Sequence, residues 1–253
     1  MADEPRFAGR SVVITGAGGG IGRACAERFS SEGAAILCAD IDGAAAEVTA
    51  SAIREGGGAA IGRALDVTDP EACCATIADA VAAHGGIDVL VNVAGVGGLT
   101  PTPDVSPDEW NHVIGVNLTG TFLMCQAAIR HLEASKGSIV NMASVAGVRA
   151  VPYNAAYCAS KGGVIMLTKV LAIEFGTAGV RANCLCPSAV DTDFLSTFTM
   201  PDDANLDLFV RGSGVIKEIL TPEKIAASVA YLASDDASMV TGTTLMMEGG
   251  ATA

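Results

Sequence analysis

The feature that most restricts the fold of this sequence is the alternation of short runs rich in Val, Ile and Leu with longer Ala-rich segments of helical character. It begins with an apolar run at residues 11–15, a helical segment at 20–32 and a second apolar run at 35–40, which together predict a strand-helix-strand unit. Strands that are apolar almost throughout are typical of parallel sheets buried on both faces. We therefore expect an α/β protein with a doubly wound parallel sheet and helices on both faces.

The alternation continues along the chain, and no linker, repeat or charge block interrupts it, so we expect a single domain over residues 1–253. Residues 1–10 form an N-terminal extension, and residues 187–220 are a long irregular stretch within the domain. The other expected elements are strands at 60–65, 89–92, 138–142, 181–186 and 244–247, and helices at 44–55, 70–84, 155–174 and 222–233.

Two helix starts carry capping signals. Asp69 precedes a proline at the first helical position, and Ser106 to Glu109 has the pattern of a capping box with Pro107 between them. A long helix should therefore follow Ser106.

Composition and charge exclude several classes of protein. The 15 Lys and Arg against 28 Asp and Glu give a net charge of -13, which repels a phosphate backbone, so we expect no nucleic-acid partner. The first residues lack the apolar core of a signal peptide, and Lys169 and Glu174 interrupt the most apolar stretch, so we expect neither export nor a membrane partner. The 8 cysteines form no C-x-x-C pair and only 3 histidines accompany them, which predicts no metal site and a reducing, cytoplasmic setting.

The first expected strand is followed at once by a glycine-rich turn, Thr-Gly-Ala-Gly-Gly-Gly-Ile-Gly at residues 15–22. Without Cβ atoms the backbone can approach a pyrophosphate, and the free N–H groups of the following helix favour an anion. The spacing of Gly16, Gly20 and Gly22 is G-x-x-x-G-x-G and departs from the general G-x-G-x-x-G fingerprint. The alternative is a merely flexible turn, which the position between strand and helix disfavours.

Two acidic positions follow the second and third expected strands. Asp40 lies where a carboxylate can accept both ribose hydroxyls of an adenosine, and it would repel a 2′-phosphate, so NAD is the expected cofactor. No Lys or Arg occupies the glycine turn to compensate. Asp66 and Val67 are candidates for the adenine side, although an Asp that only ends a strand or forms a turn explains either acid on its own.

Tyr157 and Lys161 are four residues apart and share one helical face. An ammonium near a phenol favours the phenolate, which would lower the pKa of Tyr157 towards that of a general base. Ser144 lies just past an expected strand, at the sheet edge where such proteins bind ligands. Taken singly, the pair could be a snorkelling Lys beside a half-buried Tyr, and Ser144 a turn residue.

In order along the chain, the glycine turn, Asp40, Asn92-Val93-Ala94-Gly95, Asn117, Ser144 and Tyr157-x-x-x-Lys161 together resemble the compact, single-domain short-chain dehydrogenase/reductase family. The resemblance spans residues 11–250, and its specificity lies in order and spacing. It implies a Rossmann fold and hydride transfer between a nicotinamide cofactor and a carbonyl or secondary alcohol.

The resemblance also implies roles for four residues. Tyr157 would be the general acid/base, and Ser144 would hydrogen-bond the substrate oxygen. Lys161 would hold the nicotinamide ribose and lower the pKa of Tyr157. Asn117 would support a proton-relay water from a locally distorted helix.

Further cofactor contacts are implied at three places, in addition to Asp40, Tyr157 and Lys161. They are Gly16, Gly19, Gly20, Ile21 and Gly22 at the pyrophosphate, Asn92, Ala94 and Gly95 on the adenosine side, and Pro187, Val190 and Thr192 at the nicotinamide amide. The chain departs from the family pattern at Val93, Ser188 and Glu248. Of these, Ser188 matters most, because a Cβ disfavours positive φ in the nicotinamide loop.

The stretch at 187–220 would be a substrate lid, and it contains Phe194, Phe198 and Phe209 together with five aspartates. An apolar pocket for a neutral, bulky secondary alcohol or ketone, such as a hydroxysteroid, is one interpretation, and phenylalanines that only anchor the loop are the other. A 3-oxoacyl reductase of fatty-acid type and a non-catalytic NAD(H)-sensing module remain alternative functions. The two long helices resemble those that pair across subunits in the family, which predicts a homotetramer, although their Ala-rich composition would serve an internal interface equally well.

Overall fold

The computed structural model describes residues 5–212 and 214–253. In this part of the chain, parallel strands alternate with helices as the sequence predicts. The strands are β1 (Ser11–Thr15), β2 (Ala35–Asp40), β3 (Ala59–Ala64), β4 (Val89–Asn92), β5 (Ser138–Met142), β6 (Arg181–Pro187) and β7 (Thr244–Met247). The α-helices are α1 (Gly20–Ser31), α2 (Gly43–Glu55), α3 (Pro70–His84), α4 (Pro107–Ile114), α5 (Thr121–Ser135), α6 (Ala155–Phe175) and α7 (Pro222–Ala233).

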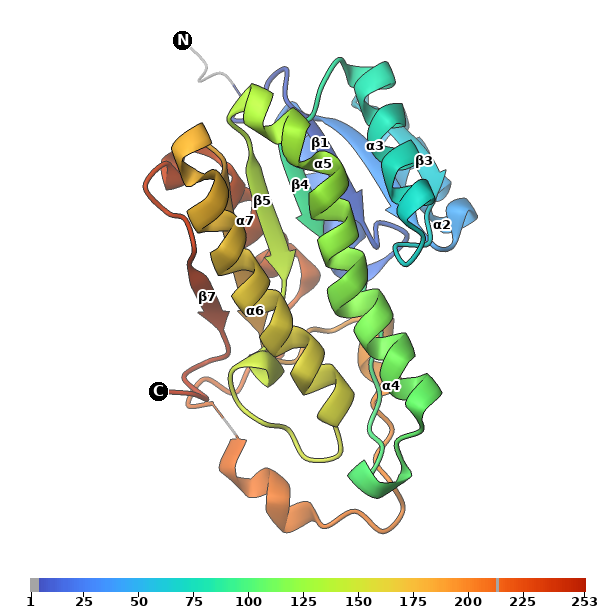
Figure 1. Ribbon diagram of the computed structural model, residues 1–253, viewed down its shortest axis with the longest axis vertical. Coiled ribbons are helices and arrows are strands. Elements are labelled where there is room, and N and C mark those ends of the chain that lie inside the picture. The colour runs from blue at the N-terminus through green and yellow to red at the C-terminus, as the bar shows by residue number, and fades with distance from the viewer. Residues whose placement is uncertain (1–4, 213) are drawn as a thin grey trace.

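The strands form one parallel sheet in the order β3-β2-β1-β4-β5-β6-β7, which confirms the doubly wound Rossmann fold. The order in which strands are added reverses beside β1, which pairs in parallel with β2 on one side and β4 on the other. All carboxyl ends of the strands meet at the same edge of the sheet, where the segment after β6 also lies (Figure 1). Open α/β sheets bind ligands at this edge, next to the point of reversal.

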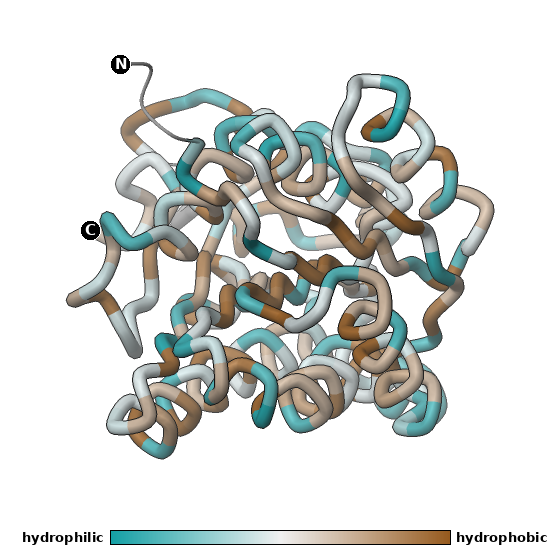
Figure 2. Tube along the Cα trace, turned by 90° about the horizontal axis from the view of Figure 1, so that it is seen from above, coloured by the Kyte–Doolittle hydropathy of each residue, from teal (hydrophilic) through white to brown (hydrophobic). Residues whose placement is uncertain are grey.

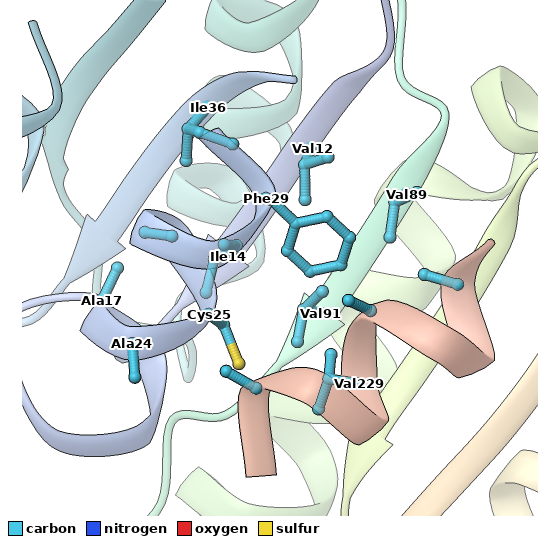
Figure 3. Packing of buried hydrophobic residues seen from close by; sticks show 14 of the residues in the cluster. Val12, Ile14, Ala17, Ala24, Cys25, Phe29, Ile36, Val89, Val91 and Val229 are labelled. Carbon is cyan, nitrogen blue, oxygen red and sulfur yellow. The ribbon is translucent and has the colours of Figure 1, made fainter. Parts of the chain in front are cut away.

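Side chains of alternate strand residues divide the core into two halves. Val12 and Ile14 of β1 pack against α1, α2 and α7, whereas Val13 between them packs against α3, α5 and α6. Phe29 of α1 fills the first half, where it lies among Val12, Val91 and Val229 (Figure 3). Viewed from above, the hydrophobic strands run between helices on two sides (Figure 2). Burial on both faces is why these strands are apolar throughout.

The long helix expected after Ser106 is interrupted. It consists of α4, a π-helical turn at Gly115–Gly120 and α5. The capping box at its start is half formed: the Ser106 hydroxyl accepts a hydrogen bond from the Glu109 N–H, but the Glu109 carboxylate accepts one from the Thr100 hydroxyl at 2.7 Å. Thr100, in the loop after β4, therefore takes the place of the Ser106 N–H as the partner of this carboxylate.

The helical stretches Pro107–Ser135 and Ala155–Ala178 are long and apolar enough to cross a membrane by length and composition alone. About half of each is buried inside the molecule (44% and 50% of the apolar window), as in core helices of soluble proteins. Their outer faces carry exposed apolar side chains, among them Phe122, Met166 and Ile173. The absence of a membrane partner stays a prediction.

The segment after β6 is more ordered than expected. It contains short 3-10 helices at Asp193–Thr197 and Leu206–Gly212, and Val190 forms an isolated parallel bridge with Leu220. This bridge closes the segment into a loop over the carboxyl edge of the sheet. We call residues 188–212 and 214–220 the lid.

Candidate active site

A cavity of about 890 Å³ opens at the carboxyl edge of the sheet. Its walls come from the glycine turn, the loops after β2 to β6 and the lid. Most of the predicted site residues line it: Gly16, Gly19, Gly20, Ile21, Asp40, Asp66, Val67, Ala94, Gly95, Ser144, Tyr157, Lys161, Pro187, Val190 and Thr192. Gly22, Asn92 and Asn117 do not line it, and each has another place in the structure.

The glycine turn leaves no room for side chains at two of its positions. A Cβ on Gly16, whose φ is +69°, would lie 2.9 Å from the Ala94 nitrogen, and one on Gly22 would lie 2.0 Å from the Gly16 carbonyl oxygen. Gly22 therefore serves close packing under the turn rather than ligand contact. The N-cap residue of α1 is Gly19, and no side chain caps this helix, so the N–H groups of its first turn are available to an anion.

Asp40 is fixed at the mouth of the glycine turn. Its carboxylate accepts hydrogen bonds from the Gly18 N–H at 2.9 Å and from the Asp42 N–H at 3.0 Å. A basic residue that the sequence analysis did not consider lies close by, because Arg23 of α1 donates to the Gly18 carbonyl oxygen at 2.6 Å. That guanidinium also contacts the Thr49 hydroxyl, which holds it on the α2 side of the turn.

The Asn92 side chain does not reach the cavity, which corrects the expectation that it contacts the adenosine. Its amide donates to the Asn141 side chain at 2.9 Å and to the Cys125 sulfur at 3.3 Å, and Asn141 in turn donates to Thr168. Asn92 is the last residue of β4, and strand alternation turns it towards α5 and α6. Ala94 and Gly95, which follow it, do reach the cavity.

Asn117 lies in the π-helical turn, as the expected local distortion requires. Its buried amide accepts from the Val96 N–H at 2.8 Å, and its nitrogen donates to the Val96 carbonyl at 2.9 Å and to the Ser160 hydroxyl at 3.0 Å. Ser160, which the sequence analysis missed, donates onward to the Tyr157 carbonyl at 2.8 Å. Asn117 thus ties the loop after β4 to the helix that carries the tyrosine.

Tyr157, Ser144 and Lys161 meet at the inner end of the cavity. Burial raises the pKa of Tyr157 to about 12, and a hydrogen bond with the Ser144 side chain acts in the opposite direction. The Lys161 ammonium donates to the Met142 carbonyl at 2.8 Å and lies 5.5 Å from the centroid of the tyrosine ring. Burial also lowers the pKa of Lys161 to about 8.

In the protein by itself, burial therefore outweighs any lowering of the Tyr157 pKa by Lys161, and the pKa lies above its ordinary value. Both side chains are almost fully buried, and loss of hydration disfavours both charged forms. The four-residue spacing correctly brings them to one helix face, but it carries no information about burial.

Ser188 does not strain the nicotinamide loop. Among the described residues, only Lys136 and Tyr153 combine a side chain with a positive φ, so Ser188 adopts an ordinary conformation. Its N–H donates to the Met247 carbonyl at 2.9 Å, which continues the pairing of β6 with β7. Beyond it, the Thr192 methyl would lie 3.1 Å from a Cβ on Gly20, so lid and glycine turn approach each other closely.

The lid phenylalanines both anchor the lid and line the cavity. The Phe194 and Phe198 rings lie 6.3 and 5.4 Å from the Tyr157 ring, centroid to centroid, and Phe209 lines the cavity while lying 6.0 Å from Tyr153. The two interpretations of these residues are thus not exclusive.

Tyr153 was missed by the sequence analysis. Its hydroxyl accepts a hydrogen bond from the Asn205 N–H of the lid at 2.8 Å, and its φ is +61°. A positive φ is unusual for a bulky residue, and no sequence signal marks it. Tyr153 fastens the lid to the segment that leads into α6.

Comparisons with known proteins agree with this geometry. A family model described as enoyl-(acyl carrier protein) reductase matches residues 16–252. D-threitol dehydrogenase of Mycolicibacterium smegmatis is 43% identical, covering 98% of this chain and 94% of that protein. 3beta-Hydroxysteroid dehydrogenase 1 of Eggerthella lenta is 41% identical, with coverages of 96% and 94%. The crystal structure of a 3-ketoacyl-(acyl-carrier-protein) reductase from Brucella melitensis complexed with NADH superposes with a TM-score of 0.88 at 34% identity, covering 98% of this chain and 100% of that one. The chain belongs to the short-chain dehydrogenase/reductase family of oxidoreductases.

Proposed function

We propose that this enzyme is an NAD-dependent oxidoreductase that interconverts a secondary alcohol and a ketone. The observation that carries the proposal is the position of Tyr157, Ser144 and Lys161 in the same cavity as the glycine turn and Asp40. The cavity thus combines proton-transfer groups with a cradle for a dinucleotide. The close packing at Gly16 and Gly22 and the uncapped first turn of α1 fit the pyrophosphate of such a cofactor.

Each polar side chain has one task in this chemistry. The nicotinamide, when bound, accepts or supplies the hydride. As a phenolate, Tyr157 would take the proton of the alcohol during oxidation, and as a phenol it would give one back during reduction, while the Ser144 hydroxyl would hold the same substrate oxygen. The Lys161 ammonium would hold the nicotinamide ribose. The Asn117 side chain is engaged by Val96 and Ser160, so the expected proton-relay water would meet Asn117 at its main chain.

The choice of NAD over NADP rests on Asp40. Its carboxylate is directed by two backbone N–H groups at the place where an adenosine ribose would lie. Two ribose hydroxyls can donate to it, whereas a 2′-phosphate would meet a like charge. The nearby Arg23 could attract a 2′-phosphate and so favour NADP, but its guanidinium is already engaged by Gly18 and Thr49.

A neutral, apolar substrate is supported by the lining near Tyr157. Phe194 and Phe198 pack against the tyrosine, and Leu99 and Val151 also line the cavity. The acidic lid opposes an anionic substrate such as an acyl carrier. The relative named as a hydroxysteroid dehydrogenase favours a bulky alcohol, and the one named as a threitol dehydrogenase makes a small polyol the second candidate.

Assembly and location are part of the same proposal. The exposed apolar side chains on α5 and α6, with Ile173 81% exposed, favour a homotetramer that covers these faces. The cysteines, all of them free and most of them buried, favour a reducing cytoplasm.

The test is the initial rate of NADH formation by the purified protein, with NAD and NADP in parallel, across neutral secondary alcohols that include hydroxysteroids and polyols. We expect turnover with NAD on a bulky alcohol. Tyr157→Phe should bind NADH normally and lose nearly all turnover. An active Tyr157→Phe variant would remove Tyr157 as the acid/base, and NADH binding without turnover on any substrate would favour the sensor alternative.

A further inference from the structure

Asn154 is a buried polar residue of the active-site cavity that has no role in the chemistry described above. It is the N-cap residue of α6 and comes three residues before Tyr157. It is 5% exposed, and it lines the main cavity and a neighbouring hollow of about 10 Å³. That hollow holds at most about one water molecule, so the main cavity is the space open to a ligand.

The Asn154 side chain does not cap its own helix. Asn is among the preferred N-cap residues, because its oxygen usually accepts an N–H of the first turn. Asp42, Asp69 and Ser106 do so at the starts of α2, α3 and α4, but Asn154 makes no such bond. No side-chain hydrogen bond within residues 5–212 and 214–253 involves the Asn154 amide.

The Asn154 amide is not among the fully enclosed polar atoms without a partner, so what accessible surface it has faces the cavity, and the described residues around it supply no alternative partner. Val151 and Phe198 pack in the hydrophobic cluster around Tyr157, and Val113 closes it from α4. Buried polar groups are normally paired, with protein, water or ligand. Asn154 therefore offers one donor group and one acceptor to the contents of the cavity, one helical turn before the tyrosine.

We propose that Asn154 is a specificity-determining residue that binds a second oxygen of the substrate, a hydroxyl or carbonyl on a carbon close to the reacting one. This inference rests on the proposed function and refines its substrate class. The substrate is then neutral and largely apolar but carries two oxygens, one held by Ser144 and Tyr157 and the other by Asn154. An amide suits a neutral hydroxyl because it can both donate to it and accept from it.

The experiment removes the amide and the second hydroxyl separately and together. We would measure kcat/KM of the wild type and of Asn154→Ala for the stereoisomers of 1,2-cyclohexanediol and for cyclohexanol. For the preferred diol, the ratio of diol to cyclohexanol activity should fall at least about tenfold in the variant, while cyclohexanol activity changes by less than about threefold. Val151→Ala is the matched control, because it enlarges the same wall without removing a polar group and should change both activities alike.

The proposal would be overturned if Asn154→Ala left the ratio of diol to cyclohexanol kcat/KM unchanged, whether or not both values fell. If the alanine variant folds poorly, the same ratio is measured for Asn154→Ser. An unchanged NADH affinity confirms that the fold of either variant is intact. If the wild type oxidises neither these alcohols nor any hydroxysteroid or polyol of the panel above with either cofactor, the proposed function fails. The proposal is then tested by calorimetry, which measures the binding of both alcohols to the NADH-loaded wild type and variant. It is supported only if the wild type binds the diol more tightly than cyclohexanol and the variant does not.

Discussion

Replacing Lys161 by Met should stabilise the cofactor-free protein while it abolishes activity. The Lys161 side chain is 3% exposed, and no carboxylate in the described residues lies within ion-pair distance of it. Burial lowers its pKa from the ordinary 10.5 to about 8. At about 1.4 kcal/mol per pH unit, keeping the charge at pH 7 costs roughly 3 kcal/mol. Losing the hydrogen bond to the Met142 carbonyl costs the variant about 1 kcal/mol, which leaves a net gain of about 2 kcal/mol.

The pH dependence of this gain identifies its cause. Because the folded pKa lies below the unfolded one, the folded protein holds fewer protons from about pH 8 to 10.5, and wild-type stability rises across that window. The advantage of Lys161→Met should therefore be about 2 kcal/mol at pH 7, or roughly 4–8 °C in Tm, and near zero at about pH 9.5. Urea unfolding followed by circular dichroism at equal protein concentrations measures it.

The exposed Lys169 on the same helix provides the control. Lys169→Met should change stability by less than about 0.5 kcal/mol at either pH. A Lys161→Met variant no more stable than the wild type at pH 7, or an advantage that does not depend on pH, would refute the reasoning about burial.

Three further outcomes are expected from single substitutions. Asp40→Ala should lower the NAD over NADP ratio of kcat/KM at least about tenfold, because it removes the carboxylate that faces the ribose; an unchanged ratio would refute that assignment. Gly22→Ala should destabilise the fold by at least about 2 kcal/mol and weaken NADH binding in fluorescence titrations, since its Cβ would lie 2.0 Å from the Gly16 carbonyl oxygen. Tyr153→Phe should raise the substrate KM about three- to tenfold and leave the NAD KM unchanged, because it frees the Asn205 N–H of the lid. A substrate KM equal to that of the wild type would show that the aromatic ring alone holds the lid.

The fold followed from the sequence because each local signal agreed with the global arrangement. The apolar runs became strands and the Ala-rich segments became helices, with most ends within a residue or two of those expected. Asp69 caps α3 through the N–H groups of Glu71 and Ala72, as the Asp-Pro pair predicts. The irregular stretch at 187–220 was the least accurate part, because short 3-10 helices have no periodicity to detect.

The site was predictable in position but not in orientation or environment. Motif order identified the cavity wall, yet it could not indicate that Asn92 faces Asn141 and Cys125, because that depends on which side of β4 the residue falls. Nor could the Tyr157–Lys161 spacing give the direction of either pKa, which depends on how completely neighbouring elements exclude water. Arg23 and Ser160 acquire their contacts only through tertiary packing.

Three unfavourable features of this molecule lie at the carboxyl edge of its sheet. Among residues 5–212 and 214–253, the buried Lys161 ammonium has no carboxylate partner and the Asn154 amide has no hydrogen-bond partner, and Tyr153 is a bulky residue with a positive φ. The other described side-chain-bearing residue with a positive φ, Lys136, is an ordinary helix C-cap in the left-handed conformation. A protein retains such local conflicts where the rest of the structure compensates for them and where a ligand relieves them. Here the two halves of the core hold the strands and helices that carry these three residues, and a dinucleotide ribose, a second substrate oxygen and a closed lid would each satisfy one of them. If that account is correct, cofactor and substrate together should stabilise the wild type more than they stabilise a Lys161→Met, Asn154→Ala double variant, in which two of the three conflicts no longer exist.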